Sequence, residues 1–197
     1  MTAAAPADPA LDPIHQQRLR AAATTVFLTY GYATTSIGRI CAEAGSSRRE
    51  FSRYFGTKHD AAHDIAGHLT RHALCRVQRC APRDGEDLLA VLSVWTQLMI
   101  TRPGWMWLEL ELAALDPRSH NEARDRAYRL RRAITELLAR TPGLAGPDRE
   151  DSALAHTAEL LITVVLGMTI QHTHATTLPA SMIRQHLALI LGLDHRQ

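Results

Sequence analysis

The sequence predicts an all-α fold in which a small basic domain precedes a larger one. Apolar residues recur at three- and four-residue steps over almost the whole chain, and no segment alternates with a two-residue period. The charge is unevenly distributed: residues 1–80 carry 10 basic against 6 acidic residues, whereas residues 81–197 carry 12 against 14. We therefore expect almost no strand, and a positively charged surface in the first part of the chain.

Composition argues against a disordered protein and against a membrane-inserted one. With 197 residues, 46% hydrophobic and 21% charged, the chain is typical of a globular protein rather than a disordered one. The apolar stretch 160–170 is shorter than the ~20 residues that span a bilayer and predicts a buried helix. Residues 1–11 lack the basic start and apolar core of a signal peptide and predict a disordered arm. Cys41, Cys75 and Cys80 form no paired framework, which fits a reducing cytoplasm.

The first predicted helix begins at Asp12, an N-cap followed by Pro13, and ends at Gly31. Its expected buried face is Leu19, Ala22, Ala23, Val26, Phe27 and Tyr30. A second, short helix begins near Thr35 and ends at Gly45, with Ile37, Ile40, Cys41 and Ala44 on one face.

A tight turn, 45–47, leads to the third helix. Ser47 and Glu50 have the spacing of a capping box, in which each side chain bonds the other residue's backbone N–H. The buried face predicted for this helix is Phe51, Tyr54 and Phe55, and the residues expected to point outward are Arg48, Arg49, Ser52 and Arg53.

Thr57 caps a long fourth helix, which runs from Lys58 to about Cys80. Proline and glycine breaks then predict helices near 86–101, 105–115, 118–140, 149–176 and 180–192. We place the small N-terminal domain at 12–57, and the linker helix with the larger domain at 58–197.

Two short helices joined by a tight turn, with arginines at the exposed start of the second, are typical of a helix-turn-helix domain. From Ile14 to Leu69 the chain resembles the TetR-type bacterial regulators. The resemblance rests on Gly31-Tyr32, Thr34 to Ile37, Ile40 to Gly45, Ser47 to Phe55, and Lys58. It implies a cytoplasmic homodimer that binds double-stranded operator DNA through a three-helix helix-turn-helix domain, and a helical second domain for effector binding and dimerisation.

The resemblance implies that Thr35 and Lys58 contact backbone phosphates, and Lys58 is the only lysine among the 22 basic residues. The residues that we predict to bind DNA are Thr35, Ser47, Arg48, Arg49, Ser52, Arg53, Tyr54 and Lys58. Arg48 and Arg49 are the best candidates for direct readout, because a guanidinium can bridge the O6 and N7 acceptors of guanine. Arg49 departs from the family, in which a small residue is usual at this position. For Phe51 we favour packing in the core, and Tyr54 can both pack and contact DNA.

The three tryptophans cluster in 95–107, where the larger domain turns at Pro103 and Gly104. Apolar walls with a few polar groups are the usual composition of a small-molecule site. The ligand-binding residues predicted on this basis are Trp95, Met99, Trp105, Trp107, Glu111, Tyr128, Met168 and His172. Each of them is equally compatible with an ordinary place in the core.

The helix that begins at Asp148 is apolar on most sides, so one face is expected to pack inward and another to meet a second subunit. Together with the last helix it predicts a four-helix dimer interface. The interface residues predicted are Leu161, Val165, Ile183, Leu187 and Ile190.

The function that these features favour is ligand-responsive repression of transcription. Two alternatives stay open: an all-helical small-molecule enzyme, and a helical adaptor with an incidental basic patch. The sequence has no nucleophile elbow, phosphate loop, zinc-protease motif or dinucleotide fingerprint, so we predict no catalytic residue and no cofactor. His68 with His72, and His172 with His174, lack further ligands of matched spacing, and we predict no metal site.

Overall fold

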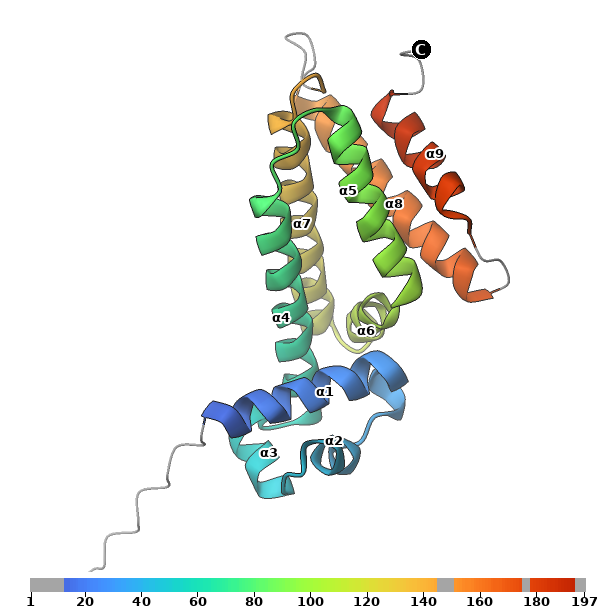
Figure 1. Cartoon of the computed structure of the whole chain (residues 1–197). Helices are drawn as coiled ribbons and strands as arrows, with labels where there is room; N and C mark the ends of the chain where they lie inside the picture. Colours follow the sequence, from blue (N-terminus) through green and yellow to red (C-terminus); the bar gives the residue numbers. More distant parts are fainter. Residues whose placement is uncertain (1–12, 145–150, 175–177, 194–197) are drawn as a thin grey trace, which may run out of the picture. The chain divides into compact units, whose positions relative to one another are not determined.

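The computed structural model describes residues 13–144, 151–174 and 178–193 (Figure 1). These residues form helices and no strand, which confirms the predicted all-α fold. The helices are α1 (Pro13–Thr34), α2 (Ile37–Ala44), α3 (Arg48–Phe55), α4 (Lys58–Arg79), α5 (Gly85–Thr101), α6 (Gly104–Ala113), α7 (Pro117–Arg140), α8 (Asp151–His174) and α9 (Ala180–Leu191). The predicted arm, 1–11, and the predicted cap Asp12 lie outside the described residues.

The chain divides into two compact units, Met1–Ile65 and Ala66–Gln197. In the first unit, α1 packs against α2 and α2 against α3. Large apolar side chains from all four helices are fully buried in this unit, among them Phe27, Ile40, Phe51 and Ile65. This core fixes α3 on one side only, because its other face carries no apolar side chain.

Helix α1 does not end at Gly31, as the sequence predicted, but bends there and continues to Thr34. Gly31 has φ 75° and ψ 175°, a conformation that glycine adopts without the steric cost of a Cβ atom. Tyr30, predicted to be buried, is 49% exposed. Its ring instead lies beneath the guanidinium of Arg39 on α2, 4.2 Å from the centroid, a contact between helices that the periodicity of α1 alone cannot reveal.

The caps of α2 determine where the turn begins. The Ser36 side chain accepts a hydrogen bond from the Arg39 N–H, and Gly45 ends the helix in the left-handed conformation, with φ 57°. The backbone N–H groups of Gly45 and Ser46 then donate to the carbonyls of Ala42 and Cys41, at 3.3 and 2.9 Å. This pattern satisfies carbonyls at the end of α2 and turns the chain toward α3.

Substitution of Gly45 by Ala is expected to lower the free energy of unfolding by about 1 kcal/mol, because an L residue in the left-handed region is strained. Urea unfolding followed by circular dichroism measures the effect. Gly67→Ala is the matched control: Gly67 lies within α4, where Ala is the better helix former, so this variant should be as stable as the wild type or more so. Equal stability of the Gly45 variant and the wild type would contradict the strained turn.

In the second unit, α7 packs against α6 and α8, and α5 packs against α8 and α9. Helix α6 lies across one end of this bundle (Figure 1). Eighteen buried residues from α4, α5, α7, α8, α9 and the adjoining loops form one apolar core, which includes Val77, Leu92, Leu137, Leu161 and Leu187. The predicted helix ends agree with the structure within about two residues, except that 149, 150, 175 and 176 lie outside the described residues.

The predicted interface residues Leu161, Ile183 and Leu187 are buried in the core of this unit, with exposed fractions of 3%, 1% and 0%. They cannot form an exposed apolar face, and this part of the prediction is wrong. Val165 and Ile190 are half-buried. The exposed apolar residues of α8 and α9 are Leu160, Leu166, Ile170, Met182 and Leu189. A helix that is apolar on most sides gives no sequence signal for which side packs inward.

Among the described residues, the segment Ser152–His172 of α8 is long and apolar enough to cross a membrane by length and composition. Core helices of soluble proteins meet the same criterion. Leu154, Ala158, Leu161 and Met168 of this segment are buried in the core of the second unit.

Candidate nucleic-acid interface

The capping box predicted at the start of α3 is present. The Glu50 N–H donates to Ser47 Oγ at 3.2 Å, and the Ser47 N–H donates to Glu50 Oε2 at 2.7 Å. The hydroxyls of Ser46 and Ser47 also donate to Glu50 Oε2, at 3.0 and 2.7 Å. These bonds lower the pKa of Glu50 to about 2, the backbone bond from Ser47 contributing most. Ser47, predicted to bind DNA, is exposed, but its hydroxyl already bonds within the protein.

Because the pKa of Glu50 is lower in the folded protein than its ordinary value of 4.5, the carboxylate stabilises the fold above that pH. We expect this contribution to be lost as the pH falls from about 4.5 toward 2. Glu50→Gln should therefore lose less stability than the wild type over this range. Thermal unfolding at a series of pH values measures the difference, with Glu43→Gln on the exposed side of α2 as control. Parallel pH curves for the wild type and the Glu50 variant would contradict the assignment.

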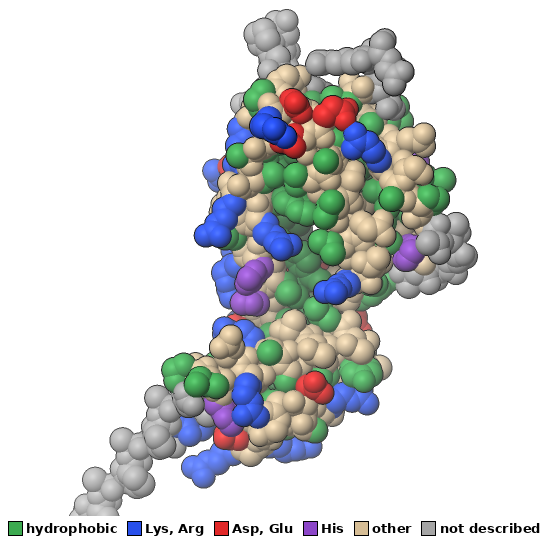
Figure 2. All heavy atoms as spheres, viewed as in Figure 1, with side chains coloured by type: hydrophobic (Ala, Val, Ile, Leu, Met, Phe, Trp, Pro, Cys, Tyr) green, Lys and Arg blue, Asp and Glu red, His purple; other side chains and the backbone are tan. Residues whose placement is uncertain are grey.

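The two faces of α3 differ sharply. Phe51 and Phe55 are buried, and their rings pack at 5.2 Å between centroids. The exposed residues are Arg48, Arg49, Ser52 and Arg53, as predicted from the sequence pattern. Lys and Arg side chains gather over the end of the first unit that carries α2 and α3 (Figure 2). An exposed basic face on the second helix of a helix-turn-helix is suited to a DNA groove.

Helix α1 holds the turn and the start of α3 in place. Arg18 Nη2 donates to the Ala44 carbonyl at 2.6 Å, and His15 Nε2 lies 3.4 Å from Ser46 Oγ and 3.3 Å from Glu50 Oε1. The side chains of His15 and Arg18 therefore fix the end of α2 and the cap of α3 to the same helix, which limits the directions in which α3 can present its arginines.

Tyr54 is half-buried, in agreement with a mixed role. Its ring packs edge-on against Phe55 at 4.4 Å, and the guanidinium of Arg20 lies 5.4 Å from its centroid. Arg20 also donates to Asp64 of α4 at 3.1 Å. The packing of Tyr54 in the domain is therefore clear, and DNA contact by this residue stays a prediction.

Thr35 directly follows α1, and Lys58 is the first residue of α4. Thr35 is only 3% exposed, and its hydroxyl donates to the Gly31 carbonyl at 2.6 Å. Thr35, predicted to contact a phosphate, is therefore too buried for that contact, and its hydroxyl has a structural role instead. Lys58 Nζ donates to the carbonyls of Tyr32 and Thr35, at 3.0 and 3.1 Å, and lies 4.1 Å from the centre of the Tyr32 ring. The Tyr32 carbonyl also accepts from the Thr35 N–H at 3.2 Å, so the ammonium group adds charged hydrogen bonds where the chain leaves α1.

Lys58→Ala is consequently expected to lower the stability of the first unit as well as any DNA affinity. Loss of two hydrogen bonds from a charged donor should cost about 1–3 kcal/mol in the free energy of unfolding. Chemical denaturation measures the loss. Arg53→Ala is the matched control, since Arg53 is exposed and its removal should change stability by less than about 0.5 kcal/mol. Unchanged stability of the Lys58 variant would show that its bonds to α1 contribute nothing.

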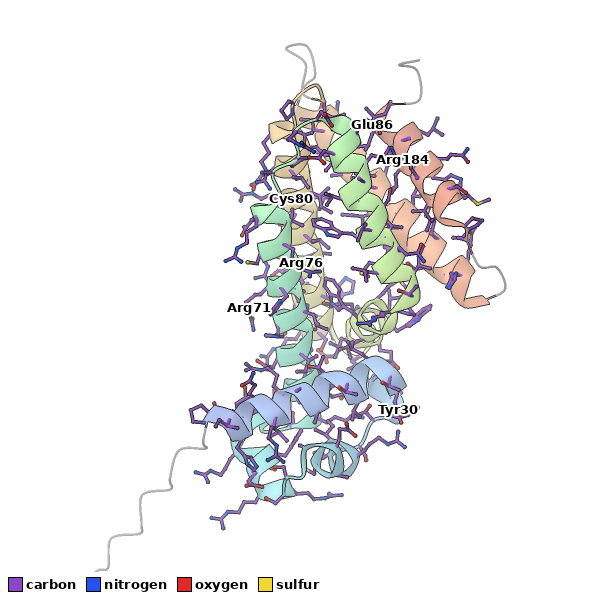
Figure 3. All side chains as sticks on the ribbon, viewed as in Figure 1. Tyr30, Arg71, Arg76, Cys80, Glu86 and Arg184 are labelled. Carbon is purple, nitrogen blue, oxygen red and sulfur yellow. The ribbon has the colours of Figure 1, made fainter. Side chains whose placement is uncertain are left out.

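Arg39, an exposed basic residue in the first turns of α2, was not among the residues predicted to bind DNA. Its guanidinium is held over the ring of Tyr30, which lies near the end of α1 (Figure 3). Arg39 adds a positive charge to the surface of the helix-turn-helix. The pair joins two different helices, so no local spacing in the sequence could have indicated it.

In the second unit, the residues predicted to line a ligand site differ in how far their side chains are buried. Met168 is buried, Trp95, Met99, Trp105, Trp107, Glu111 and His172 are half-buried, and Tyr128 is 55% exposed. Tyr128 packs beside Arg131 of its own helix, with the guanidinium 5.3 Å from the ring centroid. Ligand contact by Tyr128 stays a prediction.

A buried ion pair joins α6 and α7. Arg126 is 5% exposed, and its Nη2 lies 2.7 Å from Glu109 Oε2 while its Nε donates to both carboxylate oxygens, at 2.9 and 3.1 Å. The Trp105 indole N–H donates to Glu109 Oε1 at 3.3 Å. The Glu109 carboxylate thus accepts hydrogen bonds both from the tryptophan cluster and from Arg126 of α7.

Two polar atoms near the C-terminal ends of α5 and α8 are buried without a hydrogen-bond partner among the described residues. They are Oε1 of Gln97 and Nδ1 of His172. Buried polar atoms are nearly always bonded to protein or to another molecule. These two atoms therefore lack the partner that buried polar atoms usually have.

Comparison with known proteins agrees with this geometry. Residues 19–62 match the family model described as bacterial regulatory proteins, tetR family. The family model covers this segment and less than half of the chain. The match contains α2, α3 and the turn between them, together with most of α1 and the start of α4. The TetR-type domain confirms the resemblance inferred from the sequence motifs.

Solved structures extend the likeness of fold to nearly the whole chain. GusR of Salmonella enterica has a TM-score of 0.68 and 17% identity, with 93% of this chain and 98% of that chain covered. The fatty acid degradation regulator FadR of Bacillus halodurans has a TM-score of 0.68 and 15% identity, covering 89% and 97%. FadR of Bacillus subtilis, in complex with stearoyl-CoA, has a TM-score of 0.66 and 15% identity, covering 91% and 99%. A search of the curated proteins gives no match.

Proposed function

We propose that this protein is a cytoplasmic, dimeric, DNA-binding transcriptional regulator that represses transcription until a small molecule releases it from its operator. The observation that carries the proposal is the exposed face of α3, with Arg48, Arg49 and Arg53 on a helix that Ser47 caps inside a TetR-type domain. Regulators of this kind act by binding DNA and not by catalysis.

In a dimer, two copies of α3 enter successive major grooves about 34 Å apart. Exposed arginines can bond base edges there, and the surrounding basic groups bind phosphates. Ligand binding to the second unit favours a conformation with a different separation of the two helices, which lowers operator affinity.

The dimer interface that we propose uses the exposed apolar residues of α8 and α9. Leu160, Leu166 and Ile170 lie on α8, and Met182 and Leu189 on α9. Four helices, two from each subunit, would remove this apolar surface from water. Val165 and Ile190 are half-buried and share the sides of their helices that carry Leu161 and Leu187, so we leave them out of the proposed interface.

The effector site that we propose lies in the second unit, near Trp95, Met99 and Trp105, with Gln97 and His172 as its polar groups. A site of this composition suits a largely apolar molecule with one hydrogen-bonding group. Stearoyl-CoA is the first ligand to test, because the FadR structure of similar fold contains it.

The DNA-binding proposal is tested by selecting sequences from a random duplex library with the purified full-length protein. We expect an enriched site with two half-sites, bound with a Kd at least about a thousandfold below that of scrambled duplex. No enrichment, together with equal affinity for all duplexes, would contradict a sequence-specific regulator. Release is measured on the selected duplex as stearoyl-CoA is added, and sedimentation gives the number of subunits bound.

A further inference from the structure

We infer that Arg48 binds a DNA phosphate from a position against α2, and that Arg49 and Arg53 are the arginines that read bases. This assignment rests on the proposed function and divides the predicted DNA contacts into two kinds. It also revises the sequence-based expectation that Arg48 and Arg49 both read bases.

Gly38 provides the space that Arg48 occupies. A Cβ atom at Gly38 would lie 3.3 Å from Nη2 of Arg48, closer than ordinary van der Waals contact, and 3.9 Å from Ser36 Oγ. The guanidinium therefore extends from the first turn of α3 back to the first turn of α2. Glycine is a poor helix former, and α2 has only eight residues. Helix stability therefore does not account for the glycine at this position, whereas the space needed by Arg48 does.

The position of this charge also affects a neighbouring residue of α2. Cys41 lies three residues after Gly38, on the same side of the helix. Burial raises the pKa of the Cys41 thiol, and the nearby positive charge of Arg48 acts in the opposite direction. The space at Gly38 places the guanidinium along α2, and its effect on the Cys41 thiol follows from that position.

Arg49 and Arg53 are four residues apart and share the exposed side of α3, whereas Arg48 projects from a different side. In a helix-turn-helix, the first helix crosses the DNA backbone and the second lies in the groove. A guanidinium held along α2 is therefore positioned for the backbone, and a pair on the outer side of α3 for base edges.

The test uses the full-length protein and two duplexes: the site selected from the random library, and a scrambled site of equal length. Arg48→Ala should weaken binding to both by the same factor, and the slope of log K against log salt should fall by about 0.9. The ratio of the two affinities should stay within about twofold of the wild-type value, as for a contact without base preference. Arg49→Ala should reduce that ratio by about tenfold, within the range for loss of one bidentate base contact.

A second variant tests the role of Gly38. Gly38→Leu fills the space beside α2, so it should reproduce the uniform loss and the lower salt slope of Arg48→Ala. The double variant should then be no weaker than either single variant, because both act on one contact. Circular dichroism of each variant confirms that the helices are retained, and Arg48→Ala decides the question if Gly38→Leu does not fold.

A fall in the affinity ratio for Arg48→Ala as large as that for Arg49→Ala would overturn the inference, as would an unchanged salt slope. If the wild-type protein selects no site at all, the proposed function fails instead, so the two failures are distinguishable.

Discussion

Arg126→Ala should lower the free energy of unfolding of the second unit by about 3–5 kcal/mol. The guanidinium is almost fully buried and makes paired bonds to the Glu109 carboxylate, at 2.9 and 2.7 Å. Its removal leaves a negative charge in a poorly solvated place between α6 and α7, where the Trp105 indole is the donor that remains among the described residues. Urea unfolding followed by tryptophan fluorescence measures the loss, because all three tryptophans lie in this unit.

Two further variants serve as controls for this experiment. Arg124→Ala on the exposed side of α7 should change stability by less than about 0.5 kcal/mol. Adding Glu109→Leu to Arg126→Ala should restore much of the stability, since no unpaired charge then stays buried. A double variant as unstable as Arg126→Ala would show that the loss comes from packing of the arginine side chain and not from the orphaned carboxylate.

Reversing the charge of both Arg49 and Arg53 to Glu should reduce affinity for the selected duplex by at least about a hundredfold. Two base contacts worth about 1–3 kcal/mol each are lost, and repulsion from the phosphates is added. The free energy of unfolding should change little, because both side chains are exposed. A glutamate near the start of α3 interacts favourably with the helix dipole and one near its end unfavourably, so these two effects oppose each other. Fluorescence anisotropy of labelled duplex, with thermal unfolding in parallel, measures both quantities.

The matched control reverses Arg118 and Arg132, two exposed arginines of α7, and changes the net charge by the same amount. It should bind the duplex with nearly wild-type affinity at 0.15 M salt, where charges farther away than about 8 Å are largely screened. Equal loss in the two double variants would mean that overall charge, and not the face of α3, accounts for binding. Intact affinity in the α3 variant would refute the regulator function itself.

Short sequence patterns correctly predicted those parts of the fold that depend on residues close together in the chain. The capping box of Ser47 and Glu50, the glycine end of α2 and the faces of α3 all rest on contacts within about four residues, and all are present in the structure. The helix breaks in the second unit were equally local, since they follow from proline and glycine. The TetR resemblance added the functional class, which a family match to residues 19–62 supports.

What the sequence could not supply were contacts between residues far apart in the chain. Lys58 bonds carbonyls where the chain leaves α1, Arg39 covers Tyr30, and Arg126 pairs with Glu109. Each depends on how two helices are placed, and neither spacing nor composition contains that information.

The amino-acid sequence by itself determined that the chain is helical, where most of its described helices begin and end, and which arginines point outward from α3. Tertiary structure decided which apolar face of α8 and α9 turns inward, where Leu161 and Leu187 are buried, and which polar groups are used internally, as Thr35 is. The physical reason is range: helix caps and periodicity act within a few residues, whereas burial is settled only when separate helices pack together.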